Sequence, residues 1–152
     1  MISLALFEPE IPQNTGTLMR LCACFDMPFH IIEPCAYLWN DKKLTRSVMD
    51  YQKIVNLKRH LSFDHFLDYV NKNNKRLILI DVKGDVPCWG FKYSKDDILL
   101  MGKESSGVTD FVRENVKTSL YIPQSQGRSL NIATAASIIV GEALRFTRDF
   151  AV

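Results

Sequence analysis

The sequence has none of the short motifs by which many nucleotide-using and acyl-transferring enzymes are recognised. It contains no Gly-x-Gly-x-x-Gly fingerprint, no phosphate-binding loop ending in Gly-Lys-Ser or Gly-Lys-Thr, and no Gly-x-Ser-x-Gly turn around a serine nucleophile. After the first apolar run, where a dinucleotide-binding fold would have its glycines, the chain reads Pro-Glu-Ile-Pro. An unrelated Rossmann-like enzyme therefore lacks its usual support.

The net charge is also low, and the cysteines follow no metal-binding pattern. The formal net charge is only +2, so the overall electrostatic field gives little indication of a nucleic-acid partner. The four cysteines have neither Cys-x-x-Cys spacing nor histidines at metal-ligand distances, so we expect reduced thiols and no metal site. No apolar run approaches the roughly 18 residues of a membrane helix, and the start lacks a signal-peptide pattern. We therefore expect a cytoplasmic protein.

The composition is typical of a globular protein, and short apolar runs alternate with helical patterns. Apolar residues make up 47% and charged residues 24% of the 152 residues, so we expect one domain, 1–152. Strands are predicted at 2–7, 29–32, 54–57, 77–82, 98–101 and 119–122, and helices at 14–25, 63–70, 108–116 and 131–146. This alternation predicts an α/β fold, with a mainly parallel sheet flanked by helices and with sites at the carboxyl ends of strands.

The loop after the first predicted strand carries polar residues at the start of a helix. Its two prolines predict irregular structure, and Asn14 or Thr15 is available as the N-cap of the helix that follows. Arg20 lies about a turn and a half further on. An arginine on a helix is often a surface or ion-paired residue, so its place alone leaves that alternative open.

Two further loops leave predicted strands and hold glycine or amide residues. In one, Gly102 and Gly107 flank Glu104, which suits either close approach of the backbone to a ligand or a plain turn with an acidic cap. In the other, Ser129 and Asn131 precede the most apolar helix, where they either cap the helix or face a ligand.

Basic residues gather between 42 and 60, despite the low net charge. The first of them are Lys42, Lys43 and Arg46. A solvated helix face and a surface that contacts phosphates both fit this pattern.

Taken together and in order, these segments resemble the motifs of the SPOUT methyltransferases, and within them the tRNA (cytidine/uridine-34-2′-O)-methyltransferase family. The resemblance spans nearly the whole chain. It rests on Phe-Glu-Pro-Glu-Ile-Pro-Gln-Asn-Thr-Gly at 7–16, Arg-Leu-Cys-Ala at 20–23, Ile-Glu-Pro at 32–34, Asp-Tyr at 50–51, Gly-Lys-Glu at 102–104 and Arg-Ser-Leu-Asn at 128–131.

The resemblance implies a fold detail, a cofactor and a set of site residues. The fold detail is a carboxy-terminal deep trefoil knot, which physical reasoning alone would not predict because knotted backbones are rare. The cofactor is S-adenosylmethionine, used without a metal. The implied cofactor-binding residues are Ile80, Gly102, Ile122, Ser129 and Leu130. The implied catalytic residues are Arg20, Asn131, Glu104 and Asn14.

Some positions depart from the family pattern. Where the second loop commonly reads Gly-Pro-Glu-Thr-Arg-Gly, this chain has Gly-Lys-Glu-Ser-Ser-Gly at 102–107, so Ser106 replaces an arginine. Asp81 stands where threonine is common, and the loop before Arg128 is one residue shorter. These differences bear on substrate contacts more than on the class of reaction.

The implied reaction is methylation of the ribose 2′-hydroxyl at the wobble nucleotide, position 34, of tRNA with C or U there. Lys42, Lys43 and Arg46 would then contact tRNA phosphates. Deprotonating an arginine of pKa about 13.8 at pH 7 costs roughly 9 kcal/mol, so we expect Arg20 to act mainly as a cation. Alternatives are the same chemistry on another tRNA or rRNA nucleotide, and a non-catalytic RNA-binding module.

A chain this short, with no separate RNA-binding domain, is expected to form a homodimer. Two helix faces are more apolar than one sheet face requires, which predicts an interface between copies. Their residues are Leu18, Leu21, Phe25, Ile138, Ile139 and Leu144.

Overall fold

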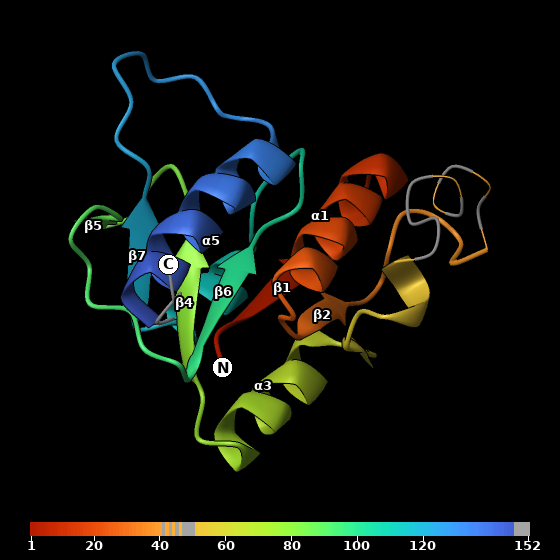
Figure 1. Cartoon of the computed structure of the whole chain (residues 1–152). Helices are drawn as coiled ribbons and strands as arrows, with labels where there is room; N and C mark the ends of the chain where they lie inside the picture. The colour runs from red at the N-terminus through yellow and green to blue at the C-terminus, as the bar shows by residue number, and fades with distance from the viewer. Residues whose placement is uncertain (41, 43, 45, 47–50, 148–152) are drawn as a thin grey trace.

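A computed structural model describes residues 1–40, 42, 44, 46 and 51–147, and within them the chain forms one sheet covered by helices (Figure 1). The described strands are β1 (Ser3–Phe7), β2 (Phe29–Ile32), β3 (Leu57–His60), β4 (Arg76–Ile80), β5 (Val86–Pro87), β6 (Asp97–Met101) and β7 (Thr118–Tyr121). The described helices are α1 (Pro12–Cys24), η1 (Tyr51–Lys53, a 3₁₀ turn), α3 (Phe63–Lys72), α4 (Asp110–Glu114) and α5 (Ile132–Thr147). None of these helices is long and apolar enough to cross a bilayer.

The strands lie in the order β3-β2-β1-β6-β4-β7-β5, and each neighbouring pair runs parallel. This confirms the predicted α/β class with a mainly parallel sheet. Because the strands are parallel, the loops that follow β1, β4, β6 and β7 leave the same edge of the sheet.

The two faces of the sheet bury different side chains of the same strand. In β1, Leu4 and Leu6 join the core beneath α1 and α5, whereas Ala5 and Phe7 join the core beneath α3 and α4. Alternate residues of a strand point to opposite faces, so a strand buried on both faces reads as a continuous apolar run. Each fully buried Leu or Phe contributes about 1.5–3 kcal/mol to stability. Figure 1 shows α1 and α5 side by side on one face, where they contact each other.

Two predicted elements were misplaced, and one short strand was not predicted. Helix α1 begins at Pro12, not at 14, because proline at the first helical position loses no hydrogen bond and has the required φ. Asn14 and Thr15 are therefore inside the helix and are not its N-cap, which is Ile11. The third strand is Leu57–His60 rather than 54–57, and the short strand β5 had no sequence signal because only two residues pair.

Side chains cap the starts of α3 and α5. The Ser62 hydroxyl accepts a hydrogen bond from the backbone N–H of His65 at 3.2 Å, at the start of α3. Asn131 Oδ1 accepts from the N–H groups of Ala133 and Thr134 at 2.9 and 3.3 Å, at the start of α5. Asn131 thus has the capping role that was one of its two expected roles.

Candidate active site

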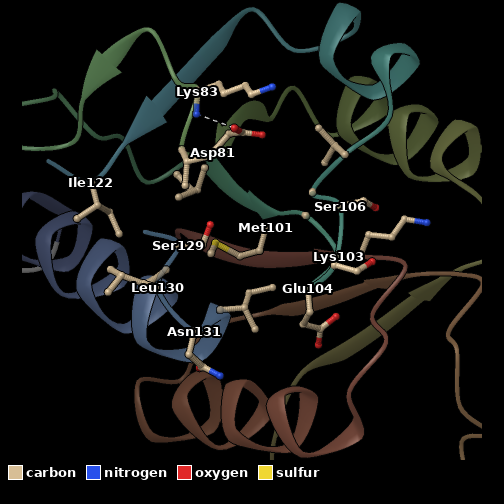
Figure 2. A pocket seen from close by; sticks show the side chains of 18 of the residues that line it. Asp81, Lys83, Met101, Lys103, Glu104, Ser106, Ile122, Ser129, Leu130 and Asn131 are labelled. Carbon is tan, nitrogen blue, oxygen red and sulfur yellow. Dashed lines mark hydrogen bonds between the residues drawn. The ribbon is translucent and has the colours of Figure 1, made fainter. Parts of the chain in front are cut away.

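A pocket of about 550 Å³ lies where the loops after β1, β4, β6 and β7 meet. Its volume is within the usual range for small-molecule sites, about 300–1,000 Å³. Figure 2 shows the side chains around it. The pocket brings together eight of the predicted site residues: Asn14, Ile80, Gly102, Glu104, Ile122, Ser129, Leu130 and Asn131.

The loop after β6 is closed on itself by backbone contacts. Lys103 and Gly107 exchange two backbone hydrogen bonds, of 2.9 and 3.0 Å, and Gly107 has a φ of 69°. A Cβ on Gly102 would lie 2.6 Å from the Cα and carbonyl carbon of Gly107. Gly102 is therefore required by the close approach of two backbone segments, and it leaves one side of this loop open to the pocket.

The carboxylate of Glu104 holds the start of α1. It accepts hydrogen bonds from the backbone N–H groups of Glu10 at 2.8 Å and Ile11 at 3.2 Å, and from Asn14 Nδ2 at 3.3 Å. These N–H groups lie at the N-terminus of α1, where a negative charge is favoured by the helix dipole. Glu104 thus connects the loop after β6 to the loop after β1.

Asn14 extends this connection to the third loop. Its Oδ1 accepts a hydrogen bond from Asn131 Nδ2 at 3.2 Å, while the amide of Asn14 donates to Glu104. The resulting row of Glu104, Asn14 and Asn131 joins Asn14 to residues 90 and 117 positions further along the chain. The family resemblance implied all three as catalytic residues from separate motifs, and the structure connects them through hydrogen bonds to Asn14.

Two charged contacts strengthen the junction between the first two loops. Lys103 Nζ lies 2.5 Å from Glu8 Oε2, and the Glu10 carboxylate accepts from the Ser105 hydroxyl and N–H at 2.8 Å each. The Ser105 hydroxyl, together with its N–H, lowers the pKa of Glu10 below its usual value. The carboxylate form of Glu10 is therefore the one that holds this junction.

The opposite side of the pocket carries a second charged group. The Asp81 carboxylate pairs with Arg113 Nη2 at 2.7 Å and accepts from the backbone N–H of Lys83 at 2.7 Å. Figure 2 shows Asp81 and Lys83 across the pocket from Glu104 and Asn131. Sequence reasoning did not assign Asp81, Lys83 or Arg113 to the site. The position of Asp81 directly after a strand was a usable signal, whereas nothing marked Arg113, which comes from α4.

Apolar side chains form another part of the pocket. Ile80 ends β4, Ile122 follows β7, and Leu130 precedes α5, so three separate segments supply them. Together with the polar groups described above, this gives one apolar region and two polar sides. Such a mixture suits a ligand with a flat apolar ring and polar substituents.

Arg20 does not line this pocket. It is exposed on α1, and its guanidinium carbon lies 5.1 Å from the centre of the Tyr51 ring. Six residues after Asn14, an α-helical side chain is displaced by about 9 Å along the axis and points to a different face. A single copy of the chain therefore does not bring Arg20 to Glu104, Asn14 and Asn131.

The described residues of the basic segment do not line the pocket either. Lys42 and Arg46 are exposed, and Lys43 lies outside the described residues. Further along, Lys58 donates to the Tyr69 hydroxyl at 2.8 Å and His60 is buried, so the basic segment is not uniformly a free surface. Within the described residues no group of three or more His, Cys, Asp or Glu side chains is placed to hold a metal ion.

The chain matches one protein family and is similar to relatives that are named as tRNA methyltransferases. The model of the SpoU rRNA Methylase family matches residues 1–141. A tRNA (cytidine(34)-2′-O)-methyltransferase of Beijerinckia indica is 44% identical over 143 residues, which cover 93% of this chain and 89% of the relative. The protein of the same name from Escherichia coli K12 is 35% identical over 148 residues, with 95% and 93% covered.

Two solved structures are also similar to this chain. A structure described as giving "structural insights into the 2-OH methylation of C/U34 on tRNA" has a TM-score of 0.91 and 35% identity, covering 96% of this chain and 95% of that chain. The SpoU methyltransferase AviRb from Streptomyces viridochromogenes, in complex with the cofactor AdoMet, has a TM-score of 0.86 and 25% identity. The match covers 94% of this chain and 56% of AviRb.

Proposed function

Because this chain belongs to the SpoU rRNA methylase family, we propose that it methylates the ribose 2′-hydroxyl of the wobble nucleotide, C or U at position 34, of tRNA. The observation that carries the choice of nucleotide is the match, over nearly its whole length, to relatives named for that reaction. The chain is an RNA 2′-O-ribose methyltransferase that uses S-adenosylmethionine. A tRNA substrate favours a cytoplasmic location for this chain.

The pocket fits this cofactor. The apolar region around Ile80, Ile122 and Leu130 suits the adenine ring, and backbone groups of the loop that begins at Gly102 lie against the pocket. Ser129 lines the same wall and can bond the cofactor through its hydroxyl or backbone. S-adenosylmethionine supplies a methyl group on a positively charged sulfur, which makes the methyl group electrophilic.

The row of Glu104, Asn14 and Asn131 fixes the geometry of the reacting side. Its hydrogen bonds hold three loops at fixed positions, so the site is already arranged before substrate arrives. Methyl transfer needs the acceptor oxygen in line with the bond that breaks, and such positioning supplies a large part of the rate. Asn131 is tied to α5 by its capping bonds and to Asn14 by its amide, and it lines the pocket.

We also propose that the active form is a homodimer. In one copy Arg20 lies outside the pocket, so a second copy is the simplest source of a cation beside the acceptor oxygen. There the guanidinium stabilises the negative charge that develops on the 2′-oxygen as its proton passes to water and the oxygen bonds to the methyl carbon, which leaves the cofactor sulfur.

The interface expected from sequence needs correction. Leu18, Ile139 and Leu144 are buried in the core of one copy and cannot form an interface. Leu21 on α1, Phe25 at its C-cap and Ile138 on α5 are only partly buried and stay available to a second copy.

A knotted carboxyl-terminal half is part of the proposal, within a single domain of residues 1–152. Strand β7 lies between β4 and β5, which are consecutive in the chain and joined only by the short loop 81–85. A Cβ on Gly84 in that loop would lie 2.4 Å from the carbonyl carbon of Leu120 in β7. This arrangement supports passage of β7 and α5 through a loop of the preceding chain.

The tRNA contacts are assigned to the basic segment that begins with Lys42, Lys43 and Arg46. Replacing these three residues by alanine should weaken tRNA binding and reduce its dependence on salt by a slope of about 2–3, because each cation that meets a phosphate releases counterions. Affinity for S-adenosylhomocysteine should not change. Equal salt dependence of the triple variant and the unmodified chain, measured by filter binding, would remove these residues from the RNA site.

In vitro methylation tests the proposed target. The purified chain, labelled S-adenosylmethionine and tRNA transcripts with C or U at position 34 should give one 2′-O-methylated nucleotide, at position 34. Transcripts whose anticodon stem-loop is exchanged for one with a purine at position 34 should accept no label. Equal labelling of both transcripts would contradict the assignment of position 34, and no labelling of either would contradict methyl transfer to unmodified tRNA.

A further inference from the structure

Asp81 is a carboxylate in the pocket wall that the reaction described above does not use. It follows Ile80 at the carboxyl end of β4, a central strand, and its side chain is only 10% exposed. One of its oxygens, Oδ2, would lie 3.7 Å from a Cβ built on Gly107. The carboxylate therefore lies between the end of β4 and the loop after β6, which are two of the segments that form the pocket.

Two contacts fix the orientation of Asp81 and leave its carboxylate able to accept further hydrogen bonds. Oδ1 accepts from the Lys83 N–H at 2.7 Å, and Oδ2 accepts from Arg113 Nη2 at 2.7 Å. An ionised carboxylate accepts about four hydrogen bonds, so both oxygens can accept another. Arg113 neutralises the charge of Asp81, and the pair therefore favours neutral hydroxyl donors over a second cation.

The neighbours of Asp81 indicate which part of a ligand it meets. Ile80 is adjacent in the chain, and Ile122 follows β7, the strand beside β4. If the adenine ring packs on this apolar region, the ribose bonded to the ring lies directly beside it, next to Asp81. A carboxylate after a strand of a parallel sheet is a common partner for a ribose hydroxyl pair in nucleotide sites.

We propose that Asp81 is a specificity-determining residue that accepts hydrogen bonds from the ribose hydroxyl pair of the bound cofactor, and that Arg113 is the residue that positions it. This inference rests on the proposed function, because it takes an adenosine-containing methyl donor as the ligand. It assigns the side of the pocket opposite Glu104 and Asn131 to recognition of the sugar, leaving their side for the acceptor (Figure 2).

Calorimetry with three small probes tests this assignment on the full chain. S-adenosylhomocysteine reports binding of the whole cofactor skeleton. 5′-Methylthioadenosine keeps the adenine and ribose and lacks the amino-acid tail, and its 2′-deoxy analogue lacks one hydroxyl. The variants are Asp81→Asn, which keeps the shape and loses the charge, and Asp110→Asn, a matched change at another acidic residue that lines the pocket.

The unmodified chain should bind 5′-methylthioadenosine roughly tenfold to hundredfold more tightly than the 2′-deoxy analogue, which is the usual worth of a hydrogen bond to a charged group. Asp81→Asn should remove most of this preference, and Asp110→Asn should keep it. Asp81→Asn should weaken S-adenosylhomocysteine and 5′-methylthioadenosine by similar factors, because both contain the same ribose.

Other results overturn the proposal in distinguishable ways. An unmodified chain that binds S-adenosylhomocysteine but does not distinguish the two nucleosides excludes recognition of the 2′-hydroxyl, whatever the folding of the variants. A loss confined to S-adenosylhomocysteine would mean that Asp81 binds the amino-acid tail. An Asp81→Asn variant that keeps the preference and melts at a lower temperature would make the Asp81–Arg113 pair purely structural. Absence of S-adenosylhomocysteine binding by the unmodified chain contradicts the proposed function itself.

Discussion

The substitution Gly102→Ala tests the account of the pocket with the smallest possible change. The added Cβ would meet the Cα and carbonyl carbon of Gly107 at 2.6 Å and its carbonyl oxygen at 2.9 Å. These are backbone atoms, so relief requires the loop from 102 to 107 to open. Opening breaks the two hydrogen bonds that Lys103 and Gly107 exchange.

The expected magnitude follows from those contacts. Two lost hydrogen bonds cost about 1–3 kcal/mol in total, and overpacking costs about 1–3 kcal/mol, so the variant should lose about 2–6 kcal/mol of stability. For a chain of this size that corresponds to a melting temperature lower by at least about 4 °C. Cofactor affinity should fall by about tenfold or more, since this loop lines the pocket.

Gly127→Ala is the matched control. Gly127 lies in the neighbouring loop, and a Cβ there would meet no atom within 4 Å. Its melting temperature should stay the same or rise slightly, because alanine reduces the freedom of the unfolded chain. Differential scanning calorimetry and titration with S-adenosylhomocysteine measure both effects. A Gly102→Ala variant as stable and as tightly binding as the Gly127→Ala control would refute the argument from close backbone approach.

The remaining predictions concern division of labour, assembly and pH. Asn131→Ala should weaken S-adenosylhomocysteine binding, whereas Arg20→Ala should leave it nearly intact and abolish turnover; calorimetry showing equal losses would place Arg20 in the donor pocket. If Arg20 serves the pocket of a second copy, a mixture of Arg20→Ala and Asn131→Ala, assayed at a cofactor concentration at which neither variant alone is active, should recover about a quarter of the normal activity by random pairing, and a monomeric sedimentation profile would exclude this. Burial, reinforced at His30 by the neighbouring His60, lowers the pKa of His30 to about 3, and burial lowers that of His60 to about 4. The unfolded chain therefore binds protons below pH about 6.5 that the folded chain does not, and urea titrations should show stability falling from pH 6.5 towards 4 by up to about 1.4 kcal/mol per pH unit for each histidine. A flat profile would contradict the burial of this pair.

Much of the fold was predictable because its physical signals are local. The runs that became β1, β4 and β6 are apolar on both faces, and Ser62 and Asn131 are helix caps that a sequence displays openly. The start of α1 was misjudged because Pro12 was taken as a helix breaker, although proline is favoured at the first helical position. The strand β5 pairs through two residues and depends on β7, so no local pattern could predict it.

Eight of the residues that line the pocket were named from the sequence, whereas the contacts between them were not predictable. Glu104, Asn14 and Asn131 were named from separate motifs, but their hydrogen bonds depend on sheet order, which brings distant loops together. The pair of Asp81 and Arg113 was missed for the same reason, since Asp81 follows β4 and Arg113 lies on α4. Arg20 was predicted correctly as a helix residue, and the chain folded alone leaves it away from the pocket.

The central claim is that this chain methylates one ribose of tRNA, at the wobble position. The most direct measurement maps 2′-O-methylated nucleotides across total tRNA from cells with and without the gene for this chain, and from cells that carry the Arg20→Ala variant. The account predicts that methylation at position 34 of tRNA with C or U there disappears in the second and third cases, while every other 2′-O-methylated nucleotide is unchanged. Loss of methylation at a different nucleotide, with position 34 intact, would contradict it.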